Sequence, residues 1–304
     1  MVPILDDYEY QYKDDGFALN TDVVLPFIDV SRVQGLDSPP YRLTEHVTEG
    51  RDGGYIDAEF IDPRTIIVEG MLYTDGNTIE QTMDIIKGNY KPQRQAQPFY
   101  FKHPGVAQRV VYCKPIECRF DVDSLRRIGC SPIQLQLKAS DPRQYASDPV
   151  FAGTQPSSIT GGVTFPITWP MSFSGGGSSG IIGIYNYGNI ATPAVLTISG
   201  PIDQPSVQHI ESGKTLTFVT TIDQYHSLIV DTGAHTALLD GTASRRSSMS
   251  STSLWFMLEP GQNTLRFNGQ FGMSVENVYS DVYSDVYGSS VPPFLSVEFR
   301  SAWL

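Results

Sequence analysis

The sequence predicts a mainly β protein with two domains and one packed helix. Three observations point to this fold class. Short segments alternate apolar and polar residues with period two, turn residues separate them, and a single segment has helical periodicity. The chain has 304 residues, 40% of them hydrophobic, which is enough for two folded domains with cores of their own.

The predicted strands are short, rich in β-branched and aromatic residues, and bounded by Gly, Pro, Asp or Asn. The clearest of them cover residues 109–112, 131–138, 195–198 and 215–219. Within 131–138, Ile133, Leu135 and Leu137 share one face, which we expect to be buried. Turn signals such as Asp75-Gly76 and Pro260-Gly261 end strands because Gly adopts positive φ without a steric cost.

Residues 78–87 form the predicted helix. Its apolar stripe has the spacing i, i+4, i+7 and consists of Ile79, Met83 and Ile86. Asn77 and Glu80 have the spacing of a capping box at the helix start. Gly88 is the expected C′ residue, and Pro92 blocks any continuation. Because a lone helix of about three turns is marginal in water, we expect the stripe to pack on a sheet.

A change of composition near residues 139–145 predicts a domain boundary. The part before it holds most of the charge, all three cysteines and the helix. The part after it is rich in Ser, Gly and Thr up to about Gly180 and then forms a regular series of strands. We therefore expect a β-rich N-terminal domain over 1–147, with its helix at about 78–87, and a C-terminal β-sandwich over 148–304.

The charge balance argues against binding of nucleic acid through its phosphates. The chain has 21 basic and 33 acidic side chains, a net charge of -12, whereas phosphate binding needs a clustered basic surface. Three cysteines imply no disulfide framework. The N-terminal sequence has no signal-like pattern and the apolar runs are strand-sized, so we expect a soluble protein of a reducing compartment without membrane insertion.

A glycine-rich segment, 175–180, matches two functional motifs by spelling alone. Gly176-x-Ser178-x-Gly180 fits a nucleophile elbow, and Gly175-x-Gly177-x-x-Gly180 fits a dinucleotide-binding loop. Both motifs require a helix directly afterwards, whereas residues 181–185 have strand character. We interpret the segment as a flexible hairpin linker.

The spacing of the Cys, His, Asp and Ser residues in the sequence does not predict a metal site or a catalytic cluster either. Cys113, Cys118 and Cys130, even with His103, lack the paired knuckles of a zinc site, so we expect buried thiols. His226 and His235 lie near Asp223 and Asp231, but nothing fixes the geometry of Ser227, Ser244 or Ser247 as a nucleophile; we interpret both histidines as turn and strand-surface residues. We therefore predict no catalytic residue, no cofactor or cofactor-binding residue and no metal ligand.

A tetrad repeat provides the candidate interaction patch. Val-Tyr-Ser-Asp occurs at 278–281 and 282–285, followed by Val286 and Tyr287. As a strand or extended loop, it places one set of side chains on one face: Tyr279, Tyr283, Tyr287, Asp281 and Asp285. A helix would instead stack the valines, and a calcium site is a further alternative, although the loop lacks the Asp/Asn-Gly density of calcium loops. Trp255, within 254–258, reads as part of a buried strand, so the repeat is the better exposed patch.

Several segments, taken in order, resemble siphophage distal tail proteins. In the C-terminal half these are 190–202 with Pro205, 228–232, 239–241, 244–246, 253–256 and 258–267. In the N-terminal half, 64–70, the helix after it and the closing Asp141-Pro142-Arg143-x-Tyr145 are similar to the family's ring-forming domain. The order and spacing of the whole set carry the resemblance, and the tetrad repeat departs from the family's pattern.

The resemblance implies a structural virion protein and not an enzyme. It implies a tail-tube-like N-terminal β domain that builds a hexameric ring, and a galectin-like C-terminal β-sandwich that projects outward. The implied partners are further copies of the chain in a homohexamer, the tail tube protein, the tail-tip hub protein, the tape measure protein and receptor-binding proteins. The implied location is the distal end of the tail at the baseplate, after synthesis in the host cytoplasm. DNA would pass through the lumen, where an acidic ring repels its phosphates.

A second class of function stays open beside this one, with an enzyme a distant third. The chain would then be an adhesive minor tail protein whose C-terminal β-sandwich binds host cell-envelope carbohydrate. Sugar-binding sandwiches use exposed aromatic rings, and the chain has 16 Tyr, 15 Phe and 3 Trp. Ring formation by the full-length protein favours the first class, whereas glycan retention by residues 148–304 favours the second.

Overall fold

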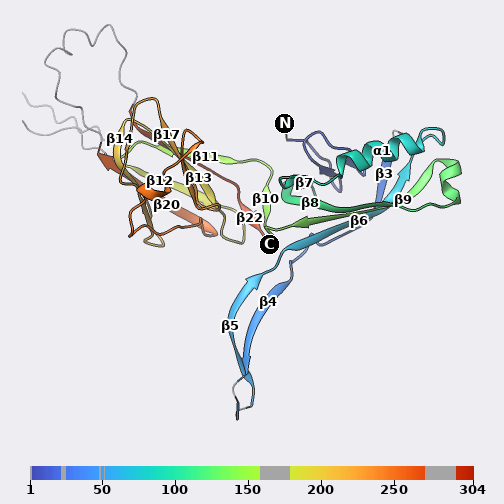
Figure 1. Ribbon diagram of the computed structural model, residues 1–304, viewed down its shortest axis with the longest axis horizontal. Coiled ribbons are helices and arrows are strands. Elements are labelled where there is room, and N and C mark those ends of the chain that lie inside the picture. The colour runs from blue at the N-terminus through green and yellow to red at the C-terminus, as the bar shows by residue number, and fades with distance from the viewer. Residues whose placement is uncertain (1, 22–24, 48, 51, 158–178, 271–291) are drawn as a thin grey trace, which may run out of the picture. The chain divides into compact units, whose positions relative to one another are not determined.

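The chain forms two compact units in the computed structural model (Figure 1). The structure describes all residues except 1, 22–24, 48, 51, 158–178 and 271–291. One unit comprises Met1–Asp148 with Ala302–Leu304, and the other Pro149–Ser301. Both are built mainly of β-strands, which confirms the predicted fold class. None of the described helices is long and apolar enough to cross a membrane.

The first unit is a curved sheet with one helix on it. Along the chain its elements are β1 (Tyr10–Tyr12), β2 (Ala18–Leu19), β3 (Phe27–Gln34), β4 (Tyr41–Val47), β5 (Gly54–Ile61), β6 (Arg64–Tyr73), α1 (Ile79–Asn89), β7 (Gln97–Phe101), β8 (Arg109–Phe120), the 3-10 turn η1 (Ser124–Ile128), β9 (Cys130–Ala139), β10 (Gln144–Ala146) and β22 (Ala302–Trp303). The main sheet has the order β2-β1-β7-β8-β9-β6-β3. The Asn20 amide donates to the Ile28 carbonyl at 2.8 Å, so the two ends of the sheet meet.

The core of the first unit lies between α1 and the concave sheet. Ile133, Leu135 and Leu137 of β9 are buried, as their alternation predicted. Ile79, Met83 and Ile86 of α1 are buried in the same cluster, which confirms the predicted apolar stripe.

The ends of α1 differ from the prediction. Thr78 is the N-cap and makes no side-chain capping bond, while Glu80 pairs with Arg126 at 2.8 Å instead of reaching back. Gly88 lies inside the helix, which runs to Asn89, and Tyr90 is the C-cap. Tyr90 is 5% exposed and stacks on Tyr12 with ring centroids 5.0 Å apart. Burial of this ring outweighs the roughly 1 kcal/mol that a glycine costs within a helix.

The last three residues of the chain lie in the first unit, whereas the sequence placed them in the second domain. In β22, Trp303 and Ala302 pair with Gln144 and Tyr145 of β10. The Trp303 ring also lies 4.3 Å from the guanidinium of Arg109. A two-residue strand has no periodicity to detect, so only its long-range pairing reveals it.

The second unit is a β-sandwich, as predicted. Its elements are β11 (Val150–Thr154), β12 (Ile181–Asn186), β13 (Ala194–Ser199), β14 (Ile202–His209), β15 (Thr215–Thr217), β16 (Thr221–Ile222), β17 (Ser227–Asp231), β18 (Thr236–Leu239), β19 (Ala243–Ser244), the 3-10 turn η2 (Arg246–Ser248), β20 (Gly261–Gln270) and β21 (Phe294–Phe299). One sheet has the order β11-β21-β13-β17-β18-β19, the other β12-β20-β14-β15 with β16 on β14. Alternate residues of both sheets form one apolar core.

The segment 254–258 is not the buried strand that its apolar residues predicted. Leu254 is 59% exposed, whereas Phe256 and Leu258 are buried. The backbone bonds of this segment go to two separate places, from Leu254 to Thr215 and between Leu258 and Thr192, so no continuous strand pairing forms. The side chain of Trp255 packs at the edge of the core. The strand expected after Gly180 is present as β12.

Candidate functional site: a projecting hairpin

Strands β4 and β5 form a two-stranded ribbon that leaves the main sheet of the first unit (Figure 1). Their register pairs Tyr41 with Ile61 and Val47 with Gly54, with one irregularity between Thr44 and Glu45. Among the described strands they pair only with each other. Each strand therefore leaves its outer row of backbone donors and acceptors open.

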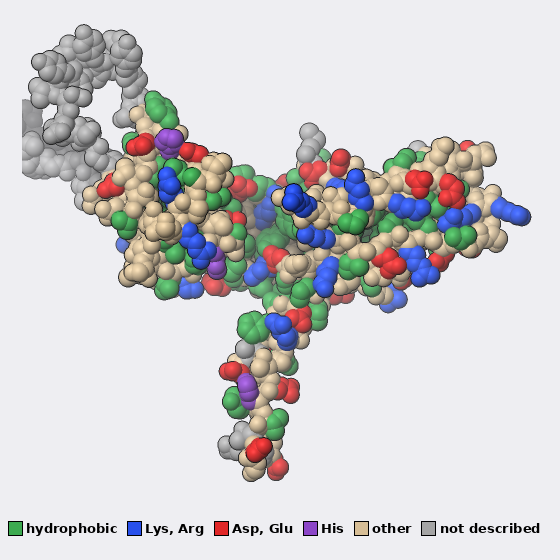
Figure 2. Space-filling model, in the orientation of Figure 1, with side chains coloured by type: hydrophobic (Ala, Val, Ile, Leu, Met, Phe, Trp, Pro, Cys, Tyr) green, Lys and Arg blue, Asp and Glu red, His purple; other side chains and the backbone are tan. Residues whose placement is uncertain are grey.

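One face of this hairpin is apolar. The cross-strand register places on it Tyr41, Leu43, Glu45 and Val47 of β4 with Ile56, Glu59 and Ile61 of β5. Leu43 is 46% exposed, Ile56 51% and Val47 81%. Figure 2 shows hydrophobic side chains standing along the hairpin with acidic ones among them. These side chains are uncovered within the chain, and exposed apolar surfaces of this kind are typical of interaction sites.

The opposite face holds the ribbon together. The Arg42 guanidinium lies 5.6 Å from the centre of the Phe60 ring. Farther out, the His46 ring stacks on Tyr55 at 5.2 Å, and its Nε2 lies 3.6 Å from a carboxylate oxygen of Asp57. Such cross-strand pairs stabilise a hairpin by about 0.2–1 kcal/mol each. The hairpin is thus cross-linked on this face, although the Tyr55 and Phe60 rings stay 58% and 52% exposed.

The base of the hairpin is clamped by Arg64, the first residue of β6. Its side chain is 1% exposed, and its Nη1 donates to the carbonyls of Gly35 at 3.2 Å and Leu36 at 3.0 Å. Burial lowers the pKa of Arg64, while Asp141 opposes this shift. Gly35 has φ +82, and a Cβ there would lie 2.0 Å from the Thr65 carbonyl oxygen. The segments entering and leaving the hairpin are therefore tied to each other.

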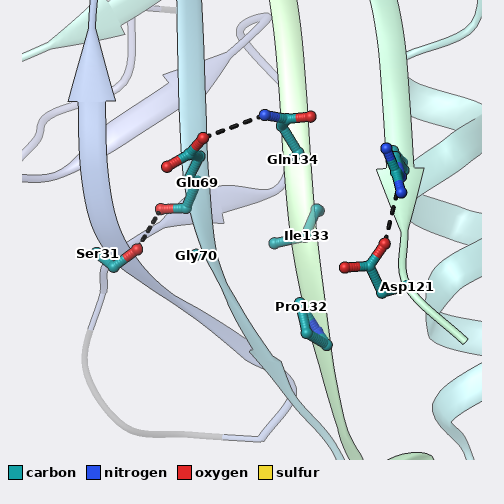
Figure 3. A pocket seen from close by; sticks show the side chains of 8 residues that line it. Ser31, Glu69, Gly70, Asp121, Pro132, Ile133 and Gln134 are labelled. Carbon is teal, nitrogen blue, oxygen red and sulfur yellow. Dashed lines mark hydrogen bonds and ion pairs between the residues drawn. The ribbon is translucent and has the colours of Figure 1, made fainter. Parts of the chain in front are cut away.

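A polar hollow of about 290 Å³ lies on the sheet of the same unit (Figure 3). Its side chains satisfy one another. Gln134 donates to the Glu69 carboxylate at 3.1 Å, Ser31 donates to the Glu69 carbonyl at 3.0 Å, and Arg119 pairs with Asp121 at 3.2 Å. The carboxylates of the hollow are thus engaged in bonds with neighbouring side chains.

Part of the second unit matches the model of a known protein family. The model of the siphovirus-type tail component, C-terminal domain, matches residues 187–283. The resemblance to siphophage distal tail proteins that the sequence predicted is thereby confirmed.

Solved structures share the fold of the chain as a whole. The crystal structure of the Dit protein (gp 19.1) of phage SPP1 has a TM-score of 0.64 at 15% identity, covering 98% of this chain and 100% of that one. The phage P2 baseplate in its activated conformation contains a chain with a TM-score of 0.51 at 12% identity, covering 98% of both chains, in the form with Ca. The form with Sr matches with the same score and identity, covering 97% of this chain. No curated protein matches the sequence.

The tetrad-repeat patch lies outside the described residues. Tyr279, Tyr283, Tyr287, Asp281 and Asp285 all fall within 271–291, and most of the glycine-rich segment falls within 158–178. The interaction role of the repeat therefore stays a prediction.

The three cysteines of the chain are free thiols. Cys113 is buried, and burial raises the pKa of its thiol. Cys118 is half-buried against the core, and burial raises its pKa to about 11. Cys130 is also half-buried, so the expectation of buried thiols holds fully for Cys113 alone. Among the described residues no three His, Cys, Asp or Glu side chains gather as a metal site.

The two histidines that the sequence singled out lie at the surface of the second unit. His226 Nδ1 lies 2.6 Å from Asp240 Oδ2 in an exposed pair. His235 stacks on Trp255 with ring centroids 4.8 Å apart. Both occupy turns, in agreement with the interpretation from sequence.

His209 is the fully buried histidine of the chain, and the sequence analysis did not single it out. Its Nδ1 lies 2.7 Å from Ser212 Oγ, and its Nε2 lies 3.0 Å from Asn263 Oδ1 and 3.3 Å from Glu211 Oε2. The ring also stacks on Phe256. Both ring nitrogens are engaged and the ring is enclosed, so the group fastens the β14–β15 turn. The signal available in the sequence was His, Glu and Ser within four residues before Gly213.

Proposed function

We propose that the chain is a structural, non-catalytic component of a siphophage tail that assembles as a hexameric ring at the distal end. The ring would join the end of the tail tube to the tail-tip hub and support host-recognition proteins. The family match over 187–283 and the shared fold with the Dit protein of SPP1 support this proposal. The observation that carries it is the uncovered apolar face of the hairpin.

A second copy of the chain is the occupant that fits this face best. The ends of the main sheet of the first unit already meet at the bond from the Asn20 amide to the Ile28 carbonyl, so part of their free edge is taken. The hairpin, in contrast, offers two open strand edges together with exposed Leu43, Val47 and Ile56. The same contact repeated head to tail between copies closes into a ring when the rotation allows it.

The proposed partners follow from this position. Besides its own copies, they are the tail tube protein on one side of the ring, the tail-tip hub on the other, the tape measure protein, and receptor-binding proteins outside. The protein would be made in the host cytoplasm and act in the virion. A net charge of -12 suits a ring through which DNA passes, because like charge prevents the genome from being retained.

Negative-stain electron microscopy of the full-length protein, with classification for rotational symmetry, tests the proposal. The expected result is a six-fold ring with a central channel. A variant in which residues 42–60 are replaced by a short Gly-Ser linker should stay monomeric and keep the thermal transition of the second unit. Monomers of the unaltered protein even in the presence of the tail tube protein would overturn the proposal, as would rings formed by the hairpin-deleted variant.

A further inference from the structure

The outer face of the five-stranded sheet in the second unit has the chemistry of a ligand-binding surface. Strands β12, β20 and β14 turn one set of side chains into the core, among them Ile184, Leu265 and Val207. The alternate residues point away from the core and form what we call the outer face: Ile181, Gly183, Tyr185, Asp203, Ser206, Gln208, Gln262, Thr264, Arg266 and Asn268. Its one carboxylate, Asp203, accepts a hydrogen bond from the Thr221 hydroxyl at 2.7 Å.

The register arranges these residues in rows across the strands. Tyr185 is opposite Gln262, Gly183 opposite Thr264, and Gln208 opposite Arg266. Strands lie about 4.8 Å apart, and alternate residues along a strand about 6.8 Å apart, so the three rows span about 14 Å. That length suits a short chain of sugar rings.

The polar groups of the outer face are available to a ligand. Among the described residues, the side chains of Gln208, Gln262 and Arg266 have no hydrogen-bond or ion-pair partner, whereas the Thr264 hydroxyl bonds the Glu211 carboxylate. Amide and guanidinium groups present donors in a plane, which suits the paired hydroxyls of a sugar. Exposed polar side chains without internal partners can bind such hydroxyls without breaking a hydrogen bond inside the protein.

An aromatic pair stands at one end of the face. Tyr185 is 50% exposed and Tyr187 73%, and their ring centroids lie 4.6 Å apart at an angle of 51°. Beside them, a Cβ added to Gly183 would meet nothing within 4 Å, so the floor next to the rings is open. A tyrosine ring offers a flat apolar surface for the C–H face of a pyranose and a hydroxyl for its rim.

The charge of the outer face indicates the charge of the ligand. Arg266 is its one cation and has no acidic partner among the described residues, although acidic residues outnumber basic ones 33 to 21 in the chain. The nearby Glu211 is engaged with the Thr264 amide at 2.9 Å and with His209 at 3.3 Å. A single free guanidinium complements one anionic substituent, whereas a nucleic-acid backbone would require a clustered basic surface.

We propose that this outer face binds a hydroxylated saccharide that carries an anionic group. Tyr185 and Tyr187 stack on one sugar ring, Gln262 and Gln208 bond its hydroxyls, and Arg266 pairs with the anionic substituent. A protein partner fits less well, because Gln262 and Gln208 make the centre of this face polar, whereas the buried centres of protein interfaces are apolar. This site goes beyond the proposed structural role and does not depend on ring formation.

The test applies full-length protein to an array of neutral and uronic-acid-containing oligosaccharides, followed by titration calorimetry with the oligosaccharides retained. We expect retention of acidic saccharides. Tyr185→Ala should weaken binding about tenfold. Arg266→Met should remove the preference for acidic over neutral chains. The matched controls are Tyr225→Ala, at a tyrosine 89% exposed elsewhere in the same unit, and Arg127→Met in the first unit, both expected to bind like the unaltered protein.

Retention of no saccharide would overturn the inference, and so would equal binding by the Tyr185 and Arg266 variants and their controls. Preferential capture of polypeptide or nucleic acid on the same face would also overturn it. Micrographs of the same preparations report ring formation separately. Rings without saccharide binding would remove this inference and leave the proposed function, and binding without rings would do the reverse.

Discussion

The double variant Leu43→Ser, Ile56→Ser should weaken self-assembly without unfolding the protein. Leu43 is 46% exposed and Ile56 51%, so about half of each side chain remains to be buried in a contact. Full burial of such a side chain contributes about 1.5–3 kcal/mol, so each contributes roughly 1 kcal/mol to assembly. Together they amount to about 2 kcal/mol per contact, or about a 30-fold higher dissociation constant.

Mass photometry over a dilution series measures this change. The midpoint of the transition from assembly to monomer should move to higher protein concentration in the double variant. Thr44→Ser, on the opposite face of the same hairpin, is the matched control and should leave the midpoint in place. Dilution curves of the double variant that coincide with those of the unaltered protein would refute the reasoning that the apolar face is a subunit contact.

Three further predictions concern the two units separately. Met83→Ala should destabilise the first unit by about 2–5 kcal/mol in chemical denaturation because Met83 is 0% exposed. Ile85 lies on the same helix but is 63% exposed, so Ile85→Ala should change stability by about 0.5 kcal/mol or less. Equal effects of the two substitutions would contradict the packing of the apolar stripe on the sheet. With its thiol pKa raised to about 11 by burial, Cys118 should resist alkylation by iodoacetamide at pH 8 in the native state, and rapid modification seen by mass spectrometry would contradict this. Hydrogen bonds from the Ser227 amide and from His226 hold the pKa of Asp240 below its usual value. The ionised Asp240 carboxylate therefore stabilises the folded protein above the ordinary carboxyl pKa, and this stabilisation is lost as pH falls through the lowered pKa. The melting temperature should therefore depend less on acid pH in Asp240→Asn, and an unchanged pH profile would count against that pair.

The two proposals assign the two units to different tasks. The hairpin of the first unit carries open strand edges and an apolar face, which are features of assembly. The outer face of the second unit carries unpaired polar groups beside two tyrosines, which are features of recognition. The sequence had focused on Tyr279, Tyr283 and Tyr287 as the exposed aromatic patch and did not single out Tyr185 or Tyr187.

The amino-acid sequence by itself determined the fold class and the elements whose burial follows a local period. The alternation of β9 and the stripe of Ile79, Met83 and Ile86 are fixed by which side chains must leave water, and that is decided within a few neighbouring residues. The order of short motifs carried the family resemblance in the same way.

Only the tertiary structure decided where elements end and which surfaces stay uncovered. The helix extends past Gly88 because Tyr90 packs on Tyr12, a residue far away in the chain. Segment 254–258 bonds to Thr215 and Thr192 instead of forming a strand. The hairpin escaped prediction because both its faces are exposed, so burial imposes no simple alternation on it. These features depend on contacts between residues far apart in the chain, which the periodicity of a short segment does not predict.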